Sequence, residues 1–288
     1  MHAVTPGTLR LVHLSDSHLT GDGSPHQGVV DTTAALDRVL ADASRVEGVR
    51  LLVGSGDLSD DGSTASYRLL RHRLDSWAGP QGAAVALVPG NHDQRPGFAE
   101  VFGGEPSGPL DRLLEVDGWR VIGLDTSVPG AGYGELRPSQ LDLLRELLAT
   151  PAPRGTVLVL HHPPLAAPTT LHEALALQDP EALADIVRGT DVRVILAGHY
   201  HHHIVGRLGG VPVLVAPGVA NDTDVSAAPG TERAVRGSGF LVVDVAPDPD
   251  DGVRSTVVRS YDGRDGDEVF ALDHDAVRRI AAAAGRPA

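Results

Sequence analysis

The chain has 288 residues, of which 41% are apolar, and it carries a formal net charge of −14 at pH 7. It contains no cysteine and its 24 basic residues are all arginine, which excludes thiolate nucleophiles, Cys-ligated zinc, lysine Schiff bases and Walker-type phosphate loops. The acidic balance also disfavours nucleic acid or an anionic membrane as the main partner, because both bind clustered positive charge. Carboxylate, imidazole, hydroxyl and metal chemistry remain for catalysis.

The sequence also indicates where in the cell the protein is expected. It has no run of 18 or more apolar residues, and the first ten residues lack the basic start and apolar stretch of a secretory signal. We therefore expect a cytoplasmic protein that does not enter the membrane.

Short apolar runs rich in Val and Leu recur along the first two thirds of the chain, separated by segments with helical periodicity. Segment 138–148 shows that periodicity well, because Leu141, Leu144 and Leu148 fall on one helix face. Such alternation is typical of an α/β domain with a largely buried sheet. The predicted strands are 9–14, 49–53, 84–88, 120–124, 156–160 and 192–196, and the predicted helices are 30–46, 64–77, 138–148 and 180–187.

The pattern changes after Val205. Segment 205–218 reads as two strands around Gly209–Gly210, and 239–245 and 255–263 read as a further antiparallel pair, with 246–252 as the hairpin loop between them. A last helix is expected at 275–284. These antiparallel strands favour two packed mixed sheets flanked by helices in a single domain, 1–288, with a core at about 9–245 and C-terminal strands and a helix at 246–288.

Five of the predicted strands run directly into residue types that ligate metals. Because the carboxyl ends of parallel strands share one edge of a sheet, these five loops can converge although they span most of the chain. Carboxylates, imidazoles and one Asn carbonyl suit Mn, Fe or Zn. The segments that follow the strands are SDSH at 15–18, GSGD at 54–57, PGNHD at 89–93, HHP at 161–163 and AGHYH at 197–201.

The ordered motifs DSH, GD, GNHD, HHPP and GHYH resemble those of the calcineurin-like metallophosphoesterases. Within that family the chain looks similar to the bacterial class III 3′,5′-cyclic-nucleotide phosphodiesterases of the mycobacterial cAMP phosphodiesterase type, through LDTSVPG, LATPAP and RGTDVRVILAGH. The resemblance covers about residues 9–245. It implies a two-sheet mixed β-sandwich flanked by helices, and relatives of this kind form homodimers.

The resemblance also implies two first-row metal ions, divalent or mixed-valence, that share the bridging ligand Asp57. In HHPP it favours the second histidine, His162, as the ligand, and makes His161 a neighbouring structural group. Carried over residue by residue, it assigns one metal to Asp16, His18, Asp57 and His201, and the other to Asp57, Asn91, His162 and His199.

The implied chemistry is attack on a phosphodiester by a hydroxide held between the two metals. His92, next to Asn91, is the expected donor to the leaving oxygen, and Asp60 is expected to orient its ring, although Asp60 could equally cap a loop. Tyr133 is the one recognition group that the loop VPGAGYGEL at 128–136 offers. Asn91 and His92 are also expected to contact the substrate.

Several functions remain open at this point. The first is hydrolysis of 3′,5′-cyclic AMP to 5′-AMP, and the second is a broad phosphodiesterase acting on glycerophosphodiesters, aryl diesters or 2′,3′-cyclic nucleotides. A DNA-repair nuclease ranks lower because the chain lacks a basic stripe. A non-catalytic metal-binding scaffold is the remote alternative, because every expected ligand position is filled.

The other histidines lie outside the motif pattern. His13 is expected in the core, and Tyr200 is expected to pack away from the metals. His202 and His203 are expected to face solvent or to lie in a strand. Surface positions are expected for the remaining histidines, which are His2, His26, His72, His172 and His274.

Overall fold

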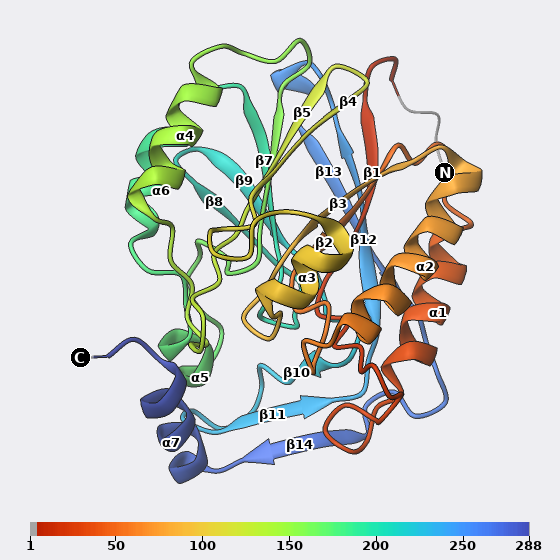
Figure 1. Ribbon diagram of the computed structural model, residues 1–288, viewed down its shortest axis with the longest axis vertical. Coiled ribbons are helices and arrows are strands. Elements are labelled where there is room, and N and C mark those ends of the chain that lie inside the picture. Colours follow the sequence, from red (N-terminus) through yellow and green to blue (C-terminus); the bar gives the residue numbers. More distant parts are fainter. Residues whose placement is uncertain (1–4, 288) are drawn as a thin grey trace.

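The computed structural model describes residues 5–287, in which two large β-sheets stack face to face and helices cover both outer faces (Figure 1). The first sheet holds three parallel strands at one side and two antiparallel strands at the other. In spatial order its strands are β13 (Val253–Arg259), β12 (Gly239–Val245), β1 (Leu9–Leu14), β2 (Leu51–Ser55) and β3 (Ala84–Val88).

The second sheet has four parallel strands in its centre and one antiparallel strand at each edge. Parallel strands in the middle of both sheets point their carboxyl ends at shared edges, where loops can form a site. In spatial order the strands are β4 (Arg112–Val116), β5 (Trp119–Leu124), β6 (Thr156–Leu160), β7 (Val192–Ala197), β9 (Val211–Val215) and β8 (Ile204–Leu208).

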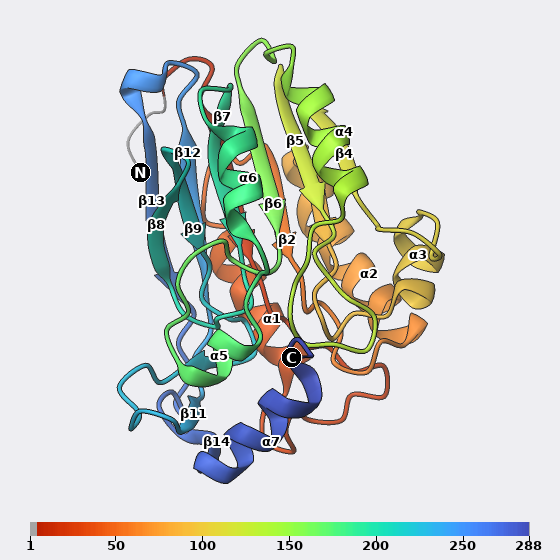
Figure 2. The same cartoon turned by 90° about the vertical axis from the view of Figure 1, so that its left-hand side faces the viewer.

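The layers are held by three apolar clusters. One lies between the two sheets, one between the first sheet and helices α1 (Thr32–Ala43) and α2 (Thr64–Gln81), and one between the second sheet and helices α4 (Pro138–Leu148) and α6 (Pro180–Val187). Figure 1 shows α4 and α6 on the left of the sandwich and α1 and α2 on the right, and in Figure 2 the first pair faces the viewer. The predicted two-sheet fold flanked by helices is therefore confirmed.

A small third sheet closes one end of the sandwich (Figure 1). It consists of β10 (Asp222–Thr223), β11 (Glu232–Val235) and β14 (Glu268–Leu272), and helix α7 (His274–Ala284) follows it. The loops that contain His201 and Gly132 lie at this end as well. The Thr223 N–H donates to the His201 carbonyl, and the Gly132 N–H donates to the Ala284 carbonyl. Among residues 5–287, no helix is long and apolar enough to cross a bilayer.

Most of the expected elements are present, with shifted ends. The predicted helix 30–46 is shorter because Asp31 caps it, accepting from the Ala34 N–H. The helix predicted at 64–77 continues to Gln81, where Gly82 ends it in the left-handed region. The predicted strand 49–53 runs from 51 to 55. The sequence pattern missed β4, α3 (Arg95–Phe102), the one-turn helix α5 (Thr170–Ala174) and the three strands of the small third sheet, all of which are short.

Candidate metal centre

The five motif loops meet at one edge of the sandwich, and both sheets contribute. Loops after β1, β2 and β3 come from the first sheet, and those after β6 and β7 come from the second. The two sheets are joined here because the His199 N–H lies 3.1 Å from Asp16 Oδ2, across the sandwich. The convergence expected from the strand ends is therefore present.

The backbone bends sharply at several predicted ligands. Among residues 5–287, eight non-glycine residues have a positive φ, and five of these are predicted metal ligands. A left-handed backbone is unfavourable for residues with a side chain, and it concentrates at functional sites where surrounding contacts hold it. The five residues, with φ between 44 and 68°, are Asp16, His18, Asp57, His199 and His201.

Four histidines each commit one ring nitrogen to an acceptor outside the centre. His18 Nδ1 lies 3.0 Å from Asp60 Oδ1, and His201 Nδ1 lies 3.2 Å from the Asn221 carbonyl. His161 Nδ1 and His199 Nε2 lie 2.8 and 3.1 Å from the carbonyls of Ser55 and Leu175. Since a carboxylate or carbonyl oxygen only accepts, these nitrogens carry the proton, and in a neutral ring the opposite nitrogen keeps a lone pair that a cation can bind.

The free nitrogens gather around the carboxylates of Asp16 and Asp57. His18 Nε2 lies 3.3 Å from His201 Nε2, which in turn lies 3.4 Å from Asp16 Oδ1. Asp57 Oδ2 sits between two groups, 3.7 Å from His18 Nε2 and 3.5 Å from His161 Nε2. Asp57 therefore lies between His18 and His161, and its role as a shared ligand, which the family resemblance implies, stays a prediction.

The two histidines of the HHPP motif lie differently, and the geometry favours the one that the sequence-based choice passed over. His161 Nε2 lies 3.1 Å from Asn91 Oδ1 and also faces Asp57. The ring of His162 has both nitrogens engaged, since Nδ1 lies 2.8 Å from the Thr126 hydroxyl and Nε2 lies 3.1 Å from the Gly132 carbonyl. His161 Nε2 thus faces two other predicted ligands, and the assignment of His162 as the ligand stays a prediction.

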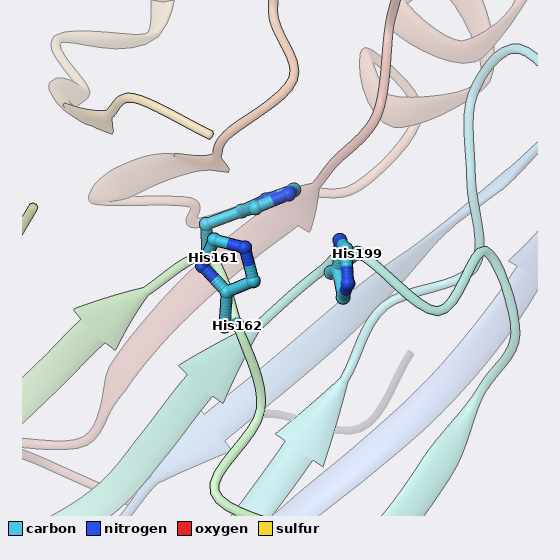
Figure 3. A group of neighbouring side chains, drawn as sticks. All are labelled: His161, His162 and His199. Atoms are coloured by element: carbon cyan, nitrogen blue, oxygen red, sulfur yellow. The ribbon is translucent and has the colours of Figure 1, made fainter. Parts of the chain in front are cut away.

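The neighbouring rings of this half of the centre are close together. Figure 3 shows His161, His162 and His199 gathered where the chain leaves β6 and β7. The His199 ring centre is 5.0 Å from that of His161 and 4.5 Å from that of His162, and the His161 and His162 rings are almost perpendicular at 82°. One ligand nitrogen from each of these three rings lies within 4.8 Å of the other two, so the group could hold a cation.

The electrostatics of the centre favour bound positive charge. Burial lowers the pKa of His18 and of His201 to about 4, so both rings are neutral at pH 7 and can ligate a cation. Burial alone would raise the pKa of Asp57, but nearby histidines outweigh it and hold that pKa well below its usual range. Burial likewise opposes a proton on His161, yet Asp57 raises its pKa to about 9.

A metal pair fits this donor set. Asp16 and Asp57 are fully buried, and an isolated buried carboxylate is very costly unless a cation or several hydrogen bonds compensate it. Their oxygens lie beside the ring nitrogens of His18, His161 and His201. Groups of three such ligand atoms, each group within 4.8 Å, include Asp16 with His18 and His201, and Asp16 with Asp57 and His161.

His92 and Asp60 lie at the rim of the centre. The His92 side chain is 42% exposed, its backbone N–H donates to Asp57 Oδ1 at 2.9 Å, and its Nδ1 lies 3.5 Å from Asp60 Oδ1. The same Asp60 oxygen is closer to His18 Nδ1, at 3.0 Å. Asp60 therefore faces His18 as well as the predicted proton donor.

Sequence reasoning missed three buried residues beside these loops. Asp93 accepts from the N–H groups of Gly90, Leu58 and Ser59, so it joins the loops after β2 and β3. In the sequence, Asp93 is the last residue of the GNHD motif, and this position is the signal that could have identified it. The surface positions expected for His26 and His172 are wrong, since these residues are only 3% and 8% exposed.

The remaining predictions about histidines can be compared with the structure directly. His13 is buried in the core, and Tyr200 is buried with its hydroxyl donating to the Leu165 carbonyl, as expected. His202 and His203 are partly exposed and His72 and His274 are exposed, while His2 lies outside the described residues. Tyr133 is partly buried, and its role in substrate binding stays a prediction.

Comparison with known proteins identifies the family to which this chain belongs. Residues 9–203 match the family of calcineurin-like phosphoesterases. A cAMP/cGMP dual specificity phosphodiesterase of Mycobacterium tuberculosis is 42% identical over 279 residues, which cover 94% of this chain and 85% of the relative. The 3′,5′-cyclic adenosine monophosphate phosphodiesterase CpdA of Pseudomonas aeruginosa is 33% identical over 285 residues, covering 95% and 97%.

Among solved structures, the purple acid phosphatase PPD1 of yellow lupin has a similar fold, with a TM-score of 0.60. The match covers 95% of this chain but only 55% of that one, at 13% identity. A similarity at this level concerns the arrangement of the two sheets and does not extend to a substrate.

Proposed function

Since this chain belongs to the calcineurin-like phosphoesterase family, we propose that it hydrolyses 3′,5′-cyclic nucleotides, cAMP first among them, to 5′-nucleotides. The observation that carries the proposal is the set of three histidines, His18, His161 and His201, whose ring nitrogens face the Asp16 and Asp57 carboxylates. Two relatives that span nearly the whole chain are named as cyclic-nucleotide phosphodiesterases, which favours this substrate class.

The ligands in this proposal follow the geometry. One metal would be held by Asp16, His18, Asp57 and His201, as the sequence predicts, and the other by Asp57, Asn91, His199 and His161, which replaces His162. When bound, two first-row ions such as Mn, Fe or Zn supply a nucleophile at neutral pH and neutralise the phosphate oxygens. The nitrogen and oxygen donors suit these ions and do not choose among them.

His92 is placed to protonate the leaving oxygen. Its Nδ1 faces Asp60, so that Nε2 is available to a substrate, and its exposed ring is accessible from solvent. Burial opposes the charge on Asp60, but the neighbouring His18 and His26 rings outweigh this and keep the pKa of Asp60 far below its usual range. Asp60 therefore stays anionic and can orient the His92 ring at all working pH values.

The wider properties of the chain agree with a small anionic substrate. A net charge of −14 repels polyanions such as nucleic acids, whereas bound cations would attract a single phosphodiester locally. A cytoplasmic location and a homodimer belong to the same proposal, through the resemblance to class III enzymes.

A broad phosphodiesterase is the second candidate. The loop 128–136 lies beside the centre, because the Gly132 carbonyl accepts from His162, yet Tyr133 and Glu135 are its only side chains with polar groups. Because this loop offers a nucleobase few polar partners, the base would contribute little to substrate selection. This favours acceptance of several diesters.

The discriminating experiment compares the products and kcat/KM of the manganese-loaded enzyme on 3′,5′-cAMP, 2′,3′-cAMP, glycerophosphocholine and an aryl phosphodiester. A kcat/KM for 3′,5′-cAMP at least about tenfold above the others, with 5′-AMP as the product, supports the proposal, since tenfold is about 1.4 kcal/mol of transition-state binding. Equal rates on all four diesters would favour the broad enzyme instead.

The role of His92 is tested in the same assay with His92→Ala. We expect kcat to fall by about 10²–10⁴, the usual contribution of general acid–base catalysis, while two metal equivalents remain bound. Loss of metal in proportion to activity would make His92 a structural residue.

A further inference from the structure

His26 is a buried histidine that none of the motifs contains. It is 3% exposed, and its ring centre lies 4.6 Å from that of His18 at an interplanar angle of 37°. Its Nδ1 lies 3.1 Å from Asp60 Oδ1, the oxygen that also faces His18 and His92. Three imidazoles thus share one carboxylate oxygen.

The segment that carries His26 forms a tight hydrogen-bonded turn, and this turn fixes the backbone from which the His26 ring projects. The His26 and Val30 backbones exchange hydrogen bonds of 2.9 and 3.0 Å, and the Gly28 N–H donates to the Pro25 carbonyl. Gln27 and Gly28 both have a positive φ, which gives the tight turn. The segment ends at α1, whose first residue, Thr32, donates its hydroxyl to the His18 carbonyl.

From this geometry we infer that His26 is a positioning residue, which holds Asp60 between the metal ligand His18 and the proton donor His92. Asp60 is 24% exposed at its side chain and lies in a loop, so without His26 its only buried ring partner is His18, and its carboxylate can rotate toward solvent or toward His92. His18 would then lose the acceptor that keeps the proton on Nδ1 and the lone pair on Nε2. Groups that orient a ligand in this way contribute about 10–100-fold to metal affinity or activity.

This inference rests on the proposed function, so its primary measurement is metal binding, which needs no substrate. Manganese affinity is measured by competition with a chelator in wild type, His26→Ala, Asp60→Ala and the double variant. We expect His26→Ala to weaken one of the two binding events about tenfold or more. Because His26 acts through Asp60, the double variant should bind manganese no more weakly than Asp60→Ala alone.

A conservative variant separates positioning from packing. The side-chain nitrogen of Asn can occupy a place near that of His Nδ1, so His26→Asn should restore most of the affinity that His26→Ala loses. The matched control is His72→Ala, which removes an exposed histidine and should leave both binding events unchanged. Thermal unfolding of the metal-free variants reports whether each still folds.

Kinetics give a second readout with the aryl phosphodiester. With saturating manganese, His26→Ala should lower kcat more than it raises KM, because His92 would be misaligned and diester binding would be retained.

Three results would overturn the inference. The first is additive losses of affinity in the double variant, and the second is an affinity of His26→Asn as low as that of His26→Ala. The third is a further metal equivalent in wild type that is absent from His26→Ala, since ligand atoms of His18, His26 and Asp60 also lie within 4.8 Å of one another. An inactive wild type with normal manganese binding would contradict the proposed function alone.

Discussion

At the residue scale, the chemistry of the centre depends on which ring nitrogen each histidine keeps free. His161 and His162 are adjacent in the chain and equally buried, so composition and exposure do not distinguish them. They differ in what Nε2 faces, since His162 Nε2 lies 3.1 Å from the Gly132 carbonyl, whereas His161 Nε2 lies 3.1 Å from Asn91 Oδ1 and 3.5 Å from Asp57 Oδ2. A metal-ligating histidine typically donates from one nitrogen to a carbonyl or carboxylate and directs the other toward the metal and its further ligands.

The variants His161→Ala and His162→Ala test this distinction. We expect His161→Ala to retain about one metal equivalent fewer than wild type and to lose at least about 100-fold in kcat/KM, because a ligand contributes no less than the groups that orient it. His162→Ala should keep both equivalents. Metal analysis after gel filtration measures the stoichiometry, and the reverse pattern would restore His162 as the ligand.

At the element scale, an ion pair fastens the antiparallel side of the first sheet. Arg10 on β1 lies opposite Asp244 on β12, and Arg254 on β13 lies opposite the same carboxylate. Arg10 Nε is 2.7 Å from Asp244 Oδ1, and both residues are buried, at 4% and 8% exposure. Burial works against the charge on Asp244, but the two arginines outweigh it and hold its pKa below the usual range.

The lowered pKa predicts a pH-dependent contribution to stability. Since the folded pKa of Asp244 lies below the unfolded value of about 3.9, the contribution is complete above about pH 4 and is lost as the pH falls through the folded pKa. Asp244→Asn should therefore reduce the free energy of unfolding by about 1.5–3 kcal/mol at pH 7, and by less below pH 4. Urea unfolding in the presence of a chelator measures both values.

An exposed pair supplies the control for this prediction. Asp142 and Arg145 lie on the surface of α4 and are 2.7 Å apart, with side chains 76% and 56% exposed. Exposed pairs contribute about 0–1 kcal/mol because water screens them. Asp142→Asn should therefore change stability little, and an equal loss in both variants would contradict the special role of the buried pair.

At the scale of the whole molecule, the centre lies where the two sheets meet. Asp16 and Asp57 follow strands of the first sheet, and His161 and His199 follow strands of the second, so that the proposed ligands of the metal pair come from both halves of the sandwich. A cation that binds this arrangement does not find it in the unfolded chain. Metal binding should therefore stabilise the entire fold.

Removal of the metals should consequently lower the melting temperature. At a free metal concentration of about 100 times Kd, each site contributes about 2.7 kcal/mol, which corresponds to about 5–10 °C for a chain of this size. Calorimetry of manganese-loaded and chelator-treated protein measures the shift. Asp57→Asn, which removes the shared carboxylate, should reduce the shift strongly, and an unchanged shift would exclude Asp57 from the centre.

The sequence by itself determined the architecture and the location of the site. Apolar runs of five or six residues become strands because local periodicity and burial act in the same direction, as in β1, β3 and β6. The strand ends then locate Asp16, Asp57, Asn91, His199 and His201 at one edge without knowledge of their contacts. Family motifs add the expectation of phosphoester chemistry.

Only the tertiary structure decided how individual side chains are used. The choice between His161 and His162 depends on the distant Thr126, Gly132, Ser55 and Asp57, and His26 becomes buried through its contacts with His18 and Asp60. Such orientations depend on packing between segments that are 30 or more residues apart in the chain, whereas periodicity reports only on neighbours within a few residues. The end of a strand can thus be predicted from neighbouring residues in the sequence. The histidine nitrogen that is available to a metal can be identified only from the residues that surround the ring in the folded protein.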